Sequence, residues 1–460
     1  MADKKGLFEK TGLFLWEIFA SLRLTIVLFS LIVVASILGT LLPDQMGFMA
    51  FLKGKPEFIV RLVFFFGIQD LFYSWWFNLL ILLLGINIIC CSLERLPNVF
   101  KIIFKRPNPP SSSMKKKIKD SLEIRSDFSS LNVVEKTEAF FQSKGMKIYK
   151  QENSSSFLAE KGRWTRIGVY IVHLGFLLLI AGVAMGRFFG FSGVIDIPEG
   201  EERGIVQLYK GKGSVKLPFK VACNSFRMET YKNGMPSLYE SELVFKDEKQ
   251  KSKHIIKVNS PYSYKGMKFV QSGYGKVLDG KVKFGVYSSA DDELIDQFEL
   301  SEKEGADLPG EKRFLFFAFR PNFHISSFNL GDTLLGIIIK GKTQRPVAIP
   351  VHKKGFDKHR GDKFYISPIT LNTKFYTSVQ VNKDPGVYIV YTGFLLILFG
   401  CFASFFIFHE KVFVFVEELP SGGSSLSIFC TINRRMELAK EKNRKNMDKL
   451  NNIFQGRGDR

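Results

Sequence analysis

The sequence predicts a membrane protein with four transmembrane α-helices and a large extracytoplasmic all-β domain between the third and fourth helices. The chain has 460 residues, of which 46% are hydrophobic, and its mean hydropathy is close to zero, an average that can hide separate apolar and polar stretches. Four apolar runs each approach the roughly 20 residues that span a bilayer core. The stretch between the last two runs consists instead of short segments rich in β-branched and aromatic residues. The apolar runs cover residues 22–42, 75–91, 167–185 and 387–408.

Residues 1–96 are predicted to form an N-terminal transmembrane hairpin, with spans at about 22–42 and 75–91. The first run is too long for the apolar part of a secretory signal, and it carries Arg23 at its start. It also ends in "LGTLLPDQ", which offers no small-residue cleavage site. We therefore expect this run to stay in the membrane as an anchor.

Residues 97–163 are predicted to form a basic cytoplasmic connection. The segment from Arg95 to Arg163 holds 15 Lys and Arg against 7 Asp and Glu and includes "KKKIK" at 115–119, whereas residues 43–94 hold 3 against 4. Because short basic connections stay in the cytoplasm, both chain termini are predicted to be cytoplasmic. Within the connection, residues 130–162 have the pattern of a helix followed by two strands.

The third transmembrane helix, predicted at 164–187, contains a histidine, His173. On a helical wheel, a stripe of glycines lies about 140° from this histidine. Glycine at such positions lets helices approach closely, so this face is expected to pack against a neighbouring helix. The stripe consists of Gly168, Gly175, Gly182 and Gly186.

Residues 188–384 are predicted to form the extracytoplasmic β domain, as a sandwich or a partly open barrel. Segments such as "SLYESELVFKD" and "TLLGIIIKGK" are bounded by Gly, Asn, Asp or Pro, and no helical period persists. The dense Tyr and Gly of "NSPYSYKG" at 259–266 and "QSGYG" at 271–275 predict a tight turn that leads into a strand, with a docking surface for a protein partner as the alternative. This domain is itself basic, but long translocated domains cross membranes largely regardless of charge.

The fourth transmembrane helix is predicted at 385–409, and a basic cytoplasmic tail follows at 410–460. The tail holds 10 Lys and Arg against 7 Asp and Glu. Its "KVFVFVEELPSGGSSLSIF" predicts a β-hairpin, and residues 434–454 predict a polar helix. We therefore expect a small folded or docking element after the last span.

Charge and cysteine content exclude several functions. The formal net charge of +21 is spread over the membrane flanks rather than concentrated on one module, so nucleic-acid binding is not predicted. Of five cysteines only Cys223 lies in the β domain, and the chain has no C-x-x-C, which excludes a dithiol oxidoreductase and a c-type cytochrome. Cys90 and Cys91 are expected to be small buried hydrophobes, with lipidation or metal binding as the alternatives.

An ionisable side chain inside a spanning helix is costly and therefore usually faces a bundle interior, a cavity or a bound group. Two interpretations of His173 remain open at this point. It forms a structural hydrogen bond to another helix, or it is an axial ligand to a haem or another metal within the membrane, because neutral imidazole is a common ligand of haem iron.

Five segments in order resemble the ResB/CcsB family of cytochrome c biogenesis proteins, the System II partners of ResC/CcsA-type proteins. They are "SLRLTIVLFSLIVVASILGTLLPDQ", "SWWFNLLILLLGINIICCSLERLP", "RWTRIGVYIVHLGFLLLIAGVAMG", "VNSPYSYKGMKFVQSGYG" and "DPGVYIVYTGFLLILFGCFASFFIFHEKVFV". The resemblance covers residues 20–415.

The resemblance implies a subunit of the cytochrome c synthase, or haem lyase, in the bacterial cytoplasmic membrane. Such a subunit is not an autonomous enzyme. With its ResC/CcsA-like partner it passes haem b outward for attachment to the C-x-x-C-H of apocytochrome c. His173 resembles the histidine of the third span, which is taken in the family as a ligand of the haem iron. No other metal is implied.

The sequence also departs from what haem attachment requires. Trp75 and Trp76 are not the W-W-D segment that belongs to the partner. After the fourth span many family members read His-Arg-Arg, whereas this chain reads His409, Glu410 and Lys411. His409 is therefore a second candidate for haem binding, with a solvated interfacial histidine as the alternative. The remaining histidines, His254, His324, His352 and His359, are predicted to lie on the surface.

Three function classes are compatible with these observations. The first is the haem-handling subunit, and the second is a non-catalytic membrane scaffold that presents apocytochrome c without ligating haem. The third is an unrelated receptor with an external sensing domain. A receptor needs a cytoplasmic output module, and the short basic cytoplasmic segments disfavour it.

Overall fold

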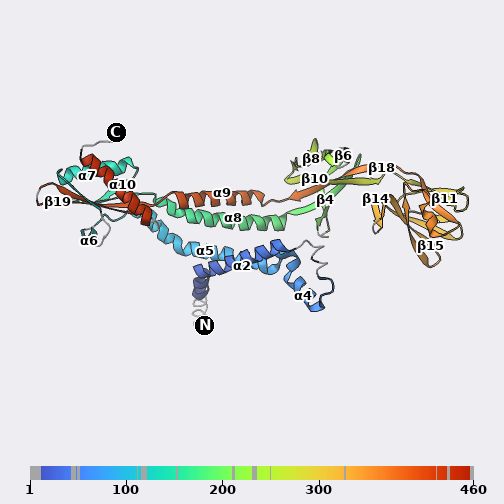
Figure 1. The fold of residues 1–460 in the computed structure, drawn as a ribbon, viewed down its shortest axis with the longest axis horizontal. Helices are drawn as coiled ribbons and strands as arrows, with labels where there is room; N and C mark the ends of the chain where they lie inside the picture. The colour runs from blue at the N-terminus through green and yellow to red at the C-terminus, as the bar shows by residue number, and fades with distance from the viewer. Residues whose placement is uncertain are drawn as a thin grey trace. The chain divides into compact units, whose positions relative to one another are not determined.

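The computed structural model describes residues 12–42, 48, 52–110, 112–115, 122–151, 154–209, 213–230, 236–248, 250–325, 328–420, 422–432 and 436–455. Most of "KKKIK" at 115–119 lies outside these ranges. The chain divides into two compact units, one of residues 1–184 with 386–460 and the other of residues 185–385 (Figure 1). Within the described residues, four helices are long and apolar enough to cross a membrane, as predicted. They are Leu22–Leu41, Trp75–Phe104, Arg163–Phe189 and Val387–Phe406.

The first two membrane helices, α2 (Leu22–Leu41) and α5 (Trp75–Phe104), pack against each other. Each begins at a serine whose hydroxyl accepts a backbone N–H of the first turn, which satisfies one of the free donors there. Thr25 donates a hydrogen bond of 2.6 Å to the buried Asn87, so a polar pair joins the helices. Helix α5 continues past the predicted end at residue 91, with Pro97 inside it.

Two short helices between α2 and α5 were not predicted. They are α4 (Glu57–Phe66) and the 3₁₀ helix η1 (Ile68–Tyr73). Gly67 joins them at φ +61°, a conformation that favours glycine and ends α4. The contacts of η1 with both α2 and α5 attach this loop to the helix pair.

The other two membrane helices form an antiparallel pair along a seam of glycines. Helix α8 (Gly168–Phe189) follows the 3₁₀ helix η2 (Arg163–Ile167), and α9 is Val387–Phe406. Figure 1 shows α8 and α9 side by side. The seam glycines repeat every seven residues and face one another, so each backbone occupies the space that a Cβ would need. The facing pairs are Gly168 with Gly400, Gly175 with Gly393 and Gly182 with Gly386.

The predicted glycine seam on α8 is therefore confirmed, but its neighbour is α9 of the same chain. A Cβ at Gly175 would lie 2.7 Å from the carbonyl oxygen of Gly393. Gly186, the fourth residue of the stripe, instead approaches the carboxylate of Asp384.

The segments before α8 and after α9 fold together into a small sheet domain, which we define as residues 122–161 and 410–454. Its five-stranded sheet has the order β1-β20-β19-β3-β2, and helices α7 and α10 pack on it. The helix, strand pair, hairpin and polar helix predicted from the sequence all form. The elements are β1 (Leu122–Ser126), α7 (Ser130–Ser143), β2 (Lys147–Lys150), β3 (Phe157–Lys161), β19 (Glu410–Glu418), β20 (Ser424–Ile432) and α10 (Met436–Phe454), with the one-turn α6 (Ser112–Lys115) before them.

The core of this domain combines residues that are far apart in the sequence. Phe141 of α7 and Phe157 of β3 are completely buried with Val412 and Val414 of β19 and Leu450 of α10. Both halves of the domain contribute residues to this one core. The tail is therefore one half of a domain rather than a separate element.

The second unit is the large β domain, residues 191–383. Its eight-stranded antiparallel sheet has the order β8-β7-β6-β5-β4-β18-β10-β9. The strands are β4 (Phe191–Pro198), β5 (Glu202–Leu208), β6 (Ser214–Thr230), β7 (Pro236–Lys246), β8 (Lys251–Lys257), β9 (Tyr262–Tyr264), β10 (Met267–Leu278) and β18 (Thr373–Lys383). The predicted tight turn joins β9 to β10, with Lys265 and Gly266 at φ +48° and +73°.

Two smaller sheets complete the large β domain and share a second apolar core. Their orders are β12-β11-β17 and β13-β14-β15-β16. Phe284, Phe314 and Phe316 are fully buried between them. The elements are β11 (Val282–Ser288), β12 (Leu294–Leu300), β13 (Gly305–Leu308), β14 (Lys312–Ile325), β15 (Phe328–Lys340), β16 (Thr343–Pro350), η4 (Phe356–Arg360) and β17 (Phe364–Thr370).

Candidate functional site

His173 lies on the face of α8 that does not carry the glycine seam, and it meets helix α5. Its Nδ1 is 2.8 Å from the hydroxyl oxygen of Ser92. The imidazole is half-buried, with the ring of Tyr170 one turn earlier at a centroid distance of 6.2 Å. The helix therefore uses one face for backbone packing and another to present an imidazole.

The contacts of Ser92 favour the tautomer of His173 in which Nδ1 carries the proton. The Ser92 hydroxyl donates its single proton to the carbonyl oxygen of Ile88 at 2.6 Å. Its oxygen can then accept a hydrogen bond from Nδ1–H of His173, the tautomer that is consistent with both contacts of the hydroxyl. This tautomer leaves a lone pair on Nε2, which has no hydrogen-bond partner in the part of the chain that the structure describes.

A neutral imidazole with Nδ1–H bonded and Nε2 open is the form that binds metal ions. Metal-ligating histidines usually donate their second N–H to an oxygen that fixes the ring and its tautomer. Ser92 supplies such an oxygen. The structural and the ligand interpretations of His173 are therefore compatible, because they use different ring nitrogens.

Arg95 is a residue near His173 that the sequence analysis did not single out. It follows Ser92 by three residues on α5, so both lie on the same helix face, and it acts electrostatically on His173 and Tyr170. The side chain is exposed and makes no hydrogen bond or ion pair to another described residue. The sequence feature that would have identified Arg95 is a positive charge one helical turn after Ser92.

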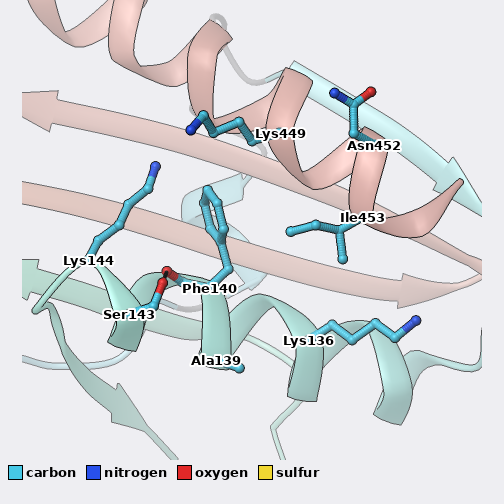
Figure 2. Close-up of a pocket in the computed structure, with 8 residues that line it drawn as sticks. All are labelled: Lys136, Ala139, Phe140, Ser143, Lys144, Lys449, Asn452 and Ile453. Atoms are coloured by element: carbon cyan, nitrogen blue, oxygen red, sulfur yellow. Dashed lines mark hydrogen bonds between the residues drawn. The ribbon is translucent and has the colours of Figure 1, made fainter. Parts of the chain in front are cut away.

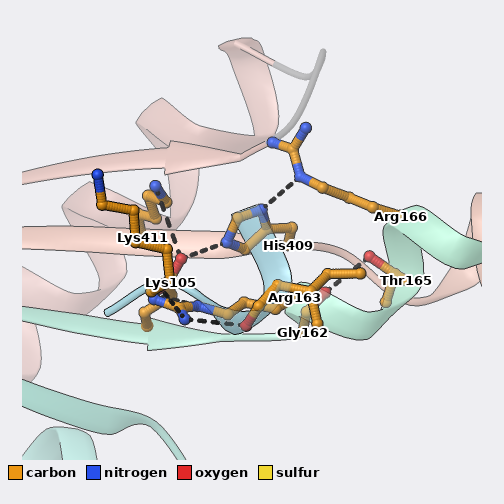
Figure 3. Close-up of polar contacts among 9 residues, drawn as sticks. Lys105, Gly162, Arg163, Thr165, Arg166, His409 and Lys411 are labelled. Atoms are coloured by element: carbon orange, nitrogen blue, oxygen red, sulfur yellow. Dashed lines mark hydrogen bonds and ion pairs between the residues drawn. The ribbon is translucent and has the colours of Figure 1, made fainter. Parts of the chain in front are cut away.

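His409 has a very different environment. It is only 3% exposed, and the alternative prediction of a solvated histidine is wrong. Arg166 Nε donates to its Nδ1 at 3.0 Å, and its Nε2–H therefore donates to Glu160 at 2.5 Å (Figure 3). Both ring nitrogens are occupied, so this histidine has no free lone pair for a metal.

Glu160 lies at the centre of a hydrogen-bond network with His409 and Arg163, which we call the Glu160 junction. Burial disfavours its charge, but hydrogen bonds from His409 and Arg163 outweigh burial and lower the pKa of its carboxyl group to about 2. Arg163 also donates to the carbonyl oxygens of Ile103 and Lys105 at 3.2 and 3.1 Å, which caps the end of α5. The network thus joins β3, α5, η2 and the segment after α9.

The two candidate histidines are not brought together. Arg166, the partner of His409, precedes His173 by seven residues, which is roughly 10 Å along the helix. Within the described residues no group of three or more His, Cys, Asp or Glu side chains could hold a metal ion. His173 is thus the candidate ligand, and His409 is a structural residue in this arrangement.

The remaining histidines and cysteines do not form a second site. His324 and His352 are exposed as predicted, His254 is half-buried on the ring of Tyr262, and the side chain of His359 lies outside the described residues. Cys90 and Cys91 are buried within α5. Burial raises the pKa of Cys223 and of Cys430 to about 12, so both thiols are unreactive at neutral pH.

Comparisons with known proteins support the resemblance found in the sequence. The ResB-like family model matches residues 22–326 and 337–444. The cytochrome c biogenesis protein CcsB of Picosynechococcus sp. is 26% identical over 400 residues, covering 84% of this chain and 82% of the relative. The CcsB protein of Microcystis aeruginosa is 24% identical, covering 84% and 85%, and the Ccs1 protein of Porphyra purpurea is 24% identical, covering 85% and 87%.

Proposed function

The chain belongs to the ResB-like family, and we propose that it is a cytochrome c synthase subunit that holds haem in the membrane through His173. Curated relatives that align with most of its length are cytochrome c biogenesis proteins, which supports a role in that process. The haem, of the b type while in transit, is the cargo of this subunit. It is received on the cytoplasmic side and presented for attachment outside.

The open Nε2 of His173 is the observation that carries this proposal. The Ser92 contact at 2.8 Å orients the ring and sets the tautomer, so the ligand lone pair exists before any haem arrives. The half-buried position of His173 within a membrane helix is also where an unpaired imidazole is costly, which favours a bound group.

We assign Arg95 as the partner of a haem carboxylate. Haem carries two carboxylates, and an arginine fork binds such a group with two parallel hydrogen bonds. Arg95 lies one turn beyond Ser92, toward the end of α5 that Arg163 caps. Iron at His173 and a carboxylate at Arg95 would hold haem at a defined depth.

The chemistry of attachment is assigned to a ResC/CcsA-like multi-span partner, and the acceptor is apocytochrome c. This chain has no W-W-D segment, the haem-handling signature that the family resemblance places in the partner. The glycine seam is occupied by α9, which means that the partner must contact other faces of the helices. The exposed apolar side chains of α2 and α5 are available for such a contact.

The proposed location is the bacterial cytoplasmic membrane, with both termini and the small sheet domain in the cytoplasm and the large β domain outside. The basic flanks of the helices support this orientation. In this arrangement Arg95 and the Glu160 junction lie on the cytoplasmic side, where haem is received.

The test replaces the ligand and restores it chemically. Purified complex carrying His173→Ala should keep its protein level, lose most of its copurifying haem in a pyridine haemochrome assay and fail to mature cytochrome c. Added imidazole should partly restore both. His352→Ala, an exposed histidine of the large β domain, is the matched control. Full haem and full maturation in His173→Ala would instead favour the scaffold that does not ligate haem.

A further inference from the structure

A pocket of about 520 Å³ lies between α7 and α10 of the small sheet domain (Figure 2). Lys136 and Lys144 of α7 and Lys449 of α10 line it, and its lining includes no carboxylate. Figure 2 shows these lysines around the gap between the two helices, with Phe140 and Ile453 between them. We call it the α7–α10 pocket.

The pocket carries excess positive charge that the described protein does not neutralise. The pKa of Lys144 is lowered, first by burial and then by the charge of Lys449. The one carboxylate that acts on Lys144, Glu410, is already paired with Lys161 and Lys442 at 3.7 and 2.8 Å. An anion in the pocket would therefore relieve repulsion among these lysines rather than compete with an existing ion pair.

The pocket also has an apolar wall. Phe140 and Ile453 are half-buried in it, and the amine of Lys144 lies 4.1 Å from the Phe140 ring centroid. A simple inorganic anion would make no favourable contact with this apolar wall. A ligand that joins an acid group to a hydrocarbon portion would use both parts.

The Lys144 end of the pocket lies close to the ends of the membrane helices. Lys161 donates to the carbonyl oxygen of Lys144 at 3.4 Å, and it precedes Arg163, where η2 begins, by two residues. Its strand partner Glu410 comes four residues after Phe406, the end of α9. At about 3.3 Å per residue in a strand, Lys161 and Glu410 lie roughly 7–13 Å from the helix ends, at the edge of the headgroup layer.

We propose that the α7–α10 pocket binds the phosphate of an anionic membrane phospholipid headgroup. The three lysines bind the phosphodiester, and Phe140 and Ile453 contact the glycerol and the first carbons of the acyl chains. The lipid would attach the small sheet domain to the inner surface of the membrane. This site is separate from His173 and does not depend on haem.

The experiment uses the full chain in nanodiscs, because both halves of the small sheet domain are needed for its core. Nanodiscs of neutral phosphatidylcholine are compared with nanodiscs that also contain phosphatidylglycerol, and lysine acylation rates are measured by mass spectrometry. Acylation of Lys144 and Lys449 should slow several-fold in the anionic nanodiscs. Lys440 and Lys445, which lie on α10 in ion pairs with glutamates, should react at unchanged rates.

A variant pair separates the pocket from general surface charge. Lys136→Gln, Lys144→Gln and Lys449→Gln together should weaken phosphatidylglycerol binding in native mass spectrometry by roughly fivefold per lysine. The control combines Lys147→Gln, Lys440→Gln and Lys445→Gln, which removes the same charge from the same domain. Equal losses in both triples would overturn the proposal, provided that both melt at the temperature of the parent.

Two soluble probes distinguish other sources of an anion. Inorganic phosphate that protects the pocket lysines as fully as phosphatidylglycerol would overturn the lipid assignment in favour of a free-anion site. Metal-free protoporphyrin, which has carboxylates but cannot bind His173 through iron, should protect less than the lipid. Stronger protection by this probe would overturn the proposal and assign the pocket to an organic dicarboxylate.

Discussion

His173 and His409 are attached to the same antiparallel helix pair, yet their surroundings differ in one decisive respect. His173 uses Nδ1 for a hydrogen bond to Ser92, and its Nε2 has no hydrogen-bond partner among the described residues. His409 uses both nitrogens, with Arg166 on one side and Glu160 on the other. Burial does not distinguish a ligand from a structural histidine here, because the more deeply buried of the two is the structural one. What distinguishes them is whether a ring nitrogen has a lone pair that is free to bind a metal.

The two histidines should therefore differ in how much their removal destabilises the fold. Removing His409 leaves charged partners buried without one of their hydrogen bonds, so the fold is affected. Removing His173 leaves only the hydroxyl of Ser92, which keeps its bond to Ile88, so the fold is spared. Three predictions test this contrast.

The largest effect is expected from the acid titration of Glu160, which measures how much the Glu160 junction contributes to the free energy of unfolding. The pKa of Glu160 is about 2 in the folded protein against an ordinary value of 4.5. Because the folded value is the lower one, its contribution of about 3 kcal/mol is fully present above pH 4.5 and is lost as the pH falls toward 2. Thermal unfolding of the full chain in detergent across this range should show the loss.

Glu160→Gln is the control for this titration. The variant should be destabilised at neutral pH, and its unfolding temperature should change less with acid than that of the parent. A parallel pH dependence in both proteins would show that other carboxylates dominate the acid unfolding. The Glu160 junction would then make no special contribution to stability.

A smaller effect is expected from His409→Ala. It removes a hydrogen bond to a buried carboxylate, which costs about 2 kcal/mol of unfolding free energy. Haem per folded molecule should stay unchanged, in contrast to His173→Ala. Limited proteolysis at the small sheet domain and the haemochrome assay measure the two quantities on the same sample. Loss of haem without loss of stability would reverse the assigned roles of the two histidines.

The smallest effect is expected from Ser92→Ala, which leaves the imidazole in place but removes the oxygen that orients it. Loss of such a supporting group weakens metal binding by roughly tenfold. Haem should therefore be retained less tightly during washing, with maturation reduced rather than abolished. Ser92→Thr keeps a hydroxyl and should restore retention. If Ser92→Ala and Ser92→Thr behave alike, the tautomer is not set by this contact.

The sequence predicted the parts of the molecule that are encoded locally. Long apolar runs identified all four membrane helices, and the Tyr- and Gly-rich segment at 259–266 identified the tight turn between β9 and β10. His173 was singled out because an ionisable residue interrupts an apolar run. Its partner Ser92 was not, because a serine in a spanning helix often bonds only to its own backbone.

What the sequence did not predict depends on contacts between distant segments. The burial of His409 requires β3 to pair with β19, and nothing local in either strand specifies that pairing. Likewise the tail was expected to be a small folded or docking element. Its hairpin and helix were visible in the sequence, but the strands that complete its sheet lie before α8. The extension of α5 to Phe104 was missed because the apolar pattern ends where the helix leaves the membrane.

Because the small sheet domain is formed from two distant segments of the chain, its paired strands are synthesised at different times. Strand β3 ends at Lys161 and its partner β19 begins at Glu410, about 250 residues later. At translation rates of roughly 5–20 residues per second, the ribosome needs some 12–50 s to cover that distance. Throughout this interval β3 has one unpaired edge and β1 has no neighbour at all, a state that invites aggregation. Closure of this domain is therefore a late event, which waits until the large β domain has been made and the fourth helix inserted.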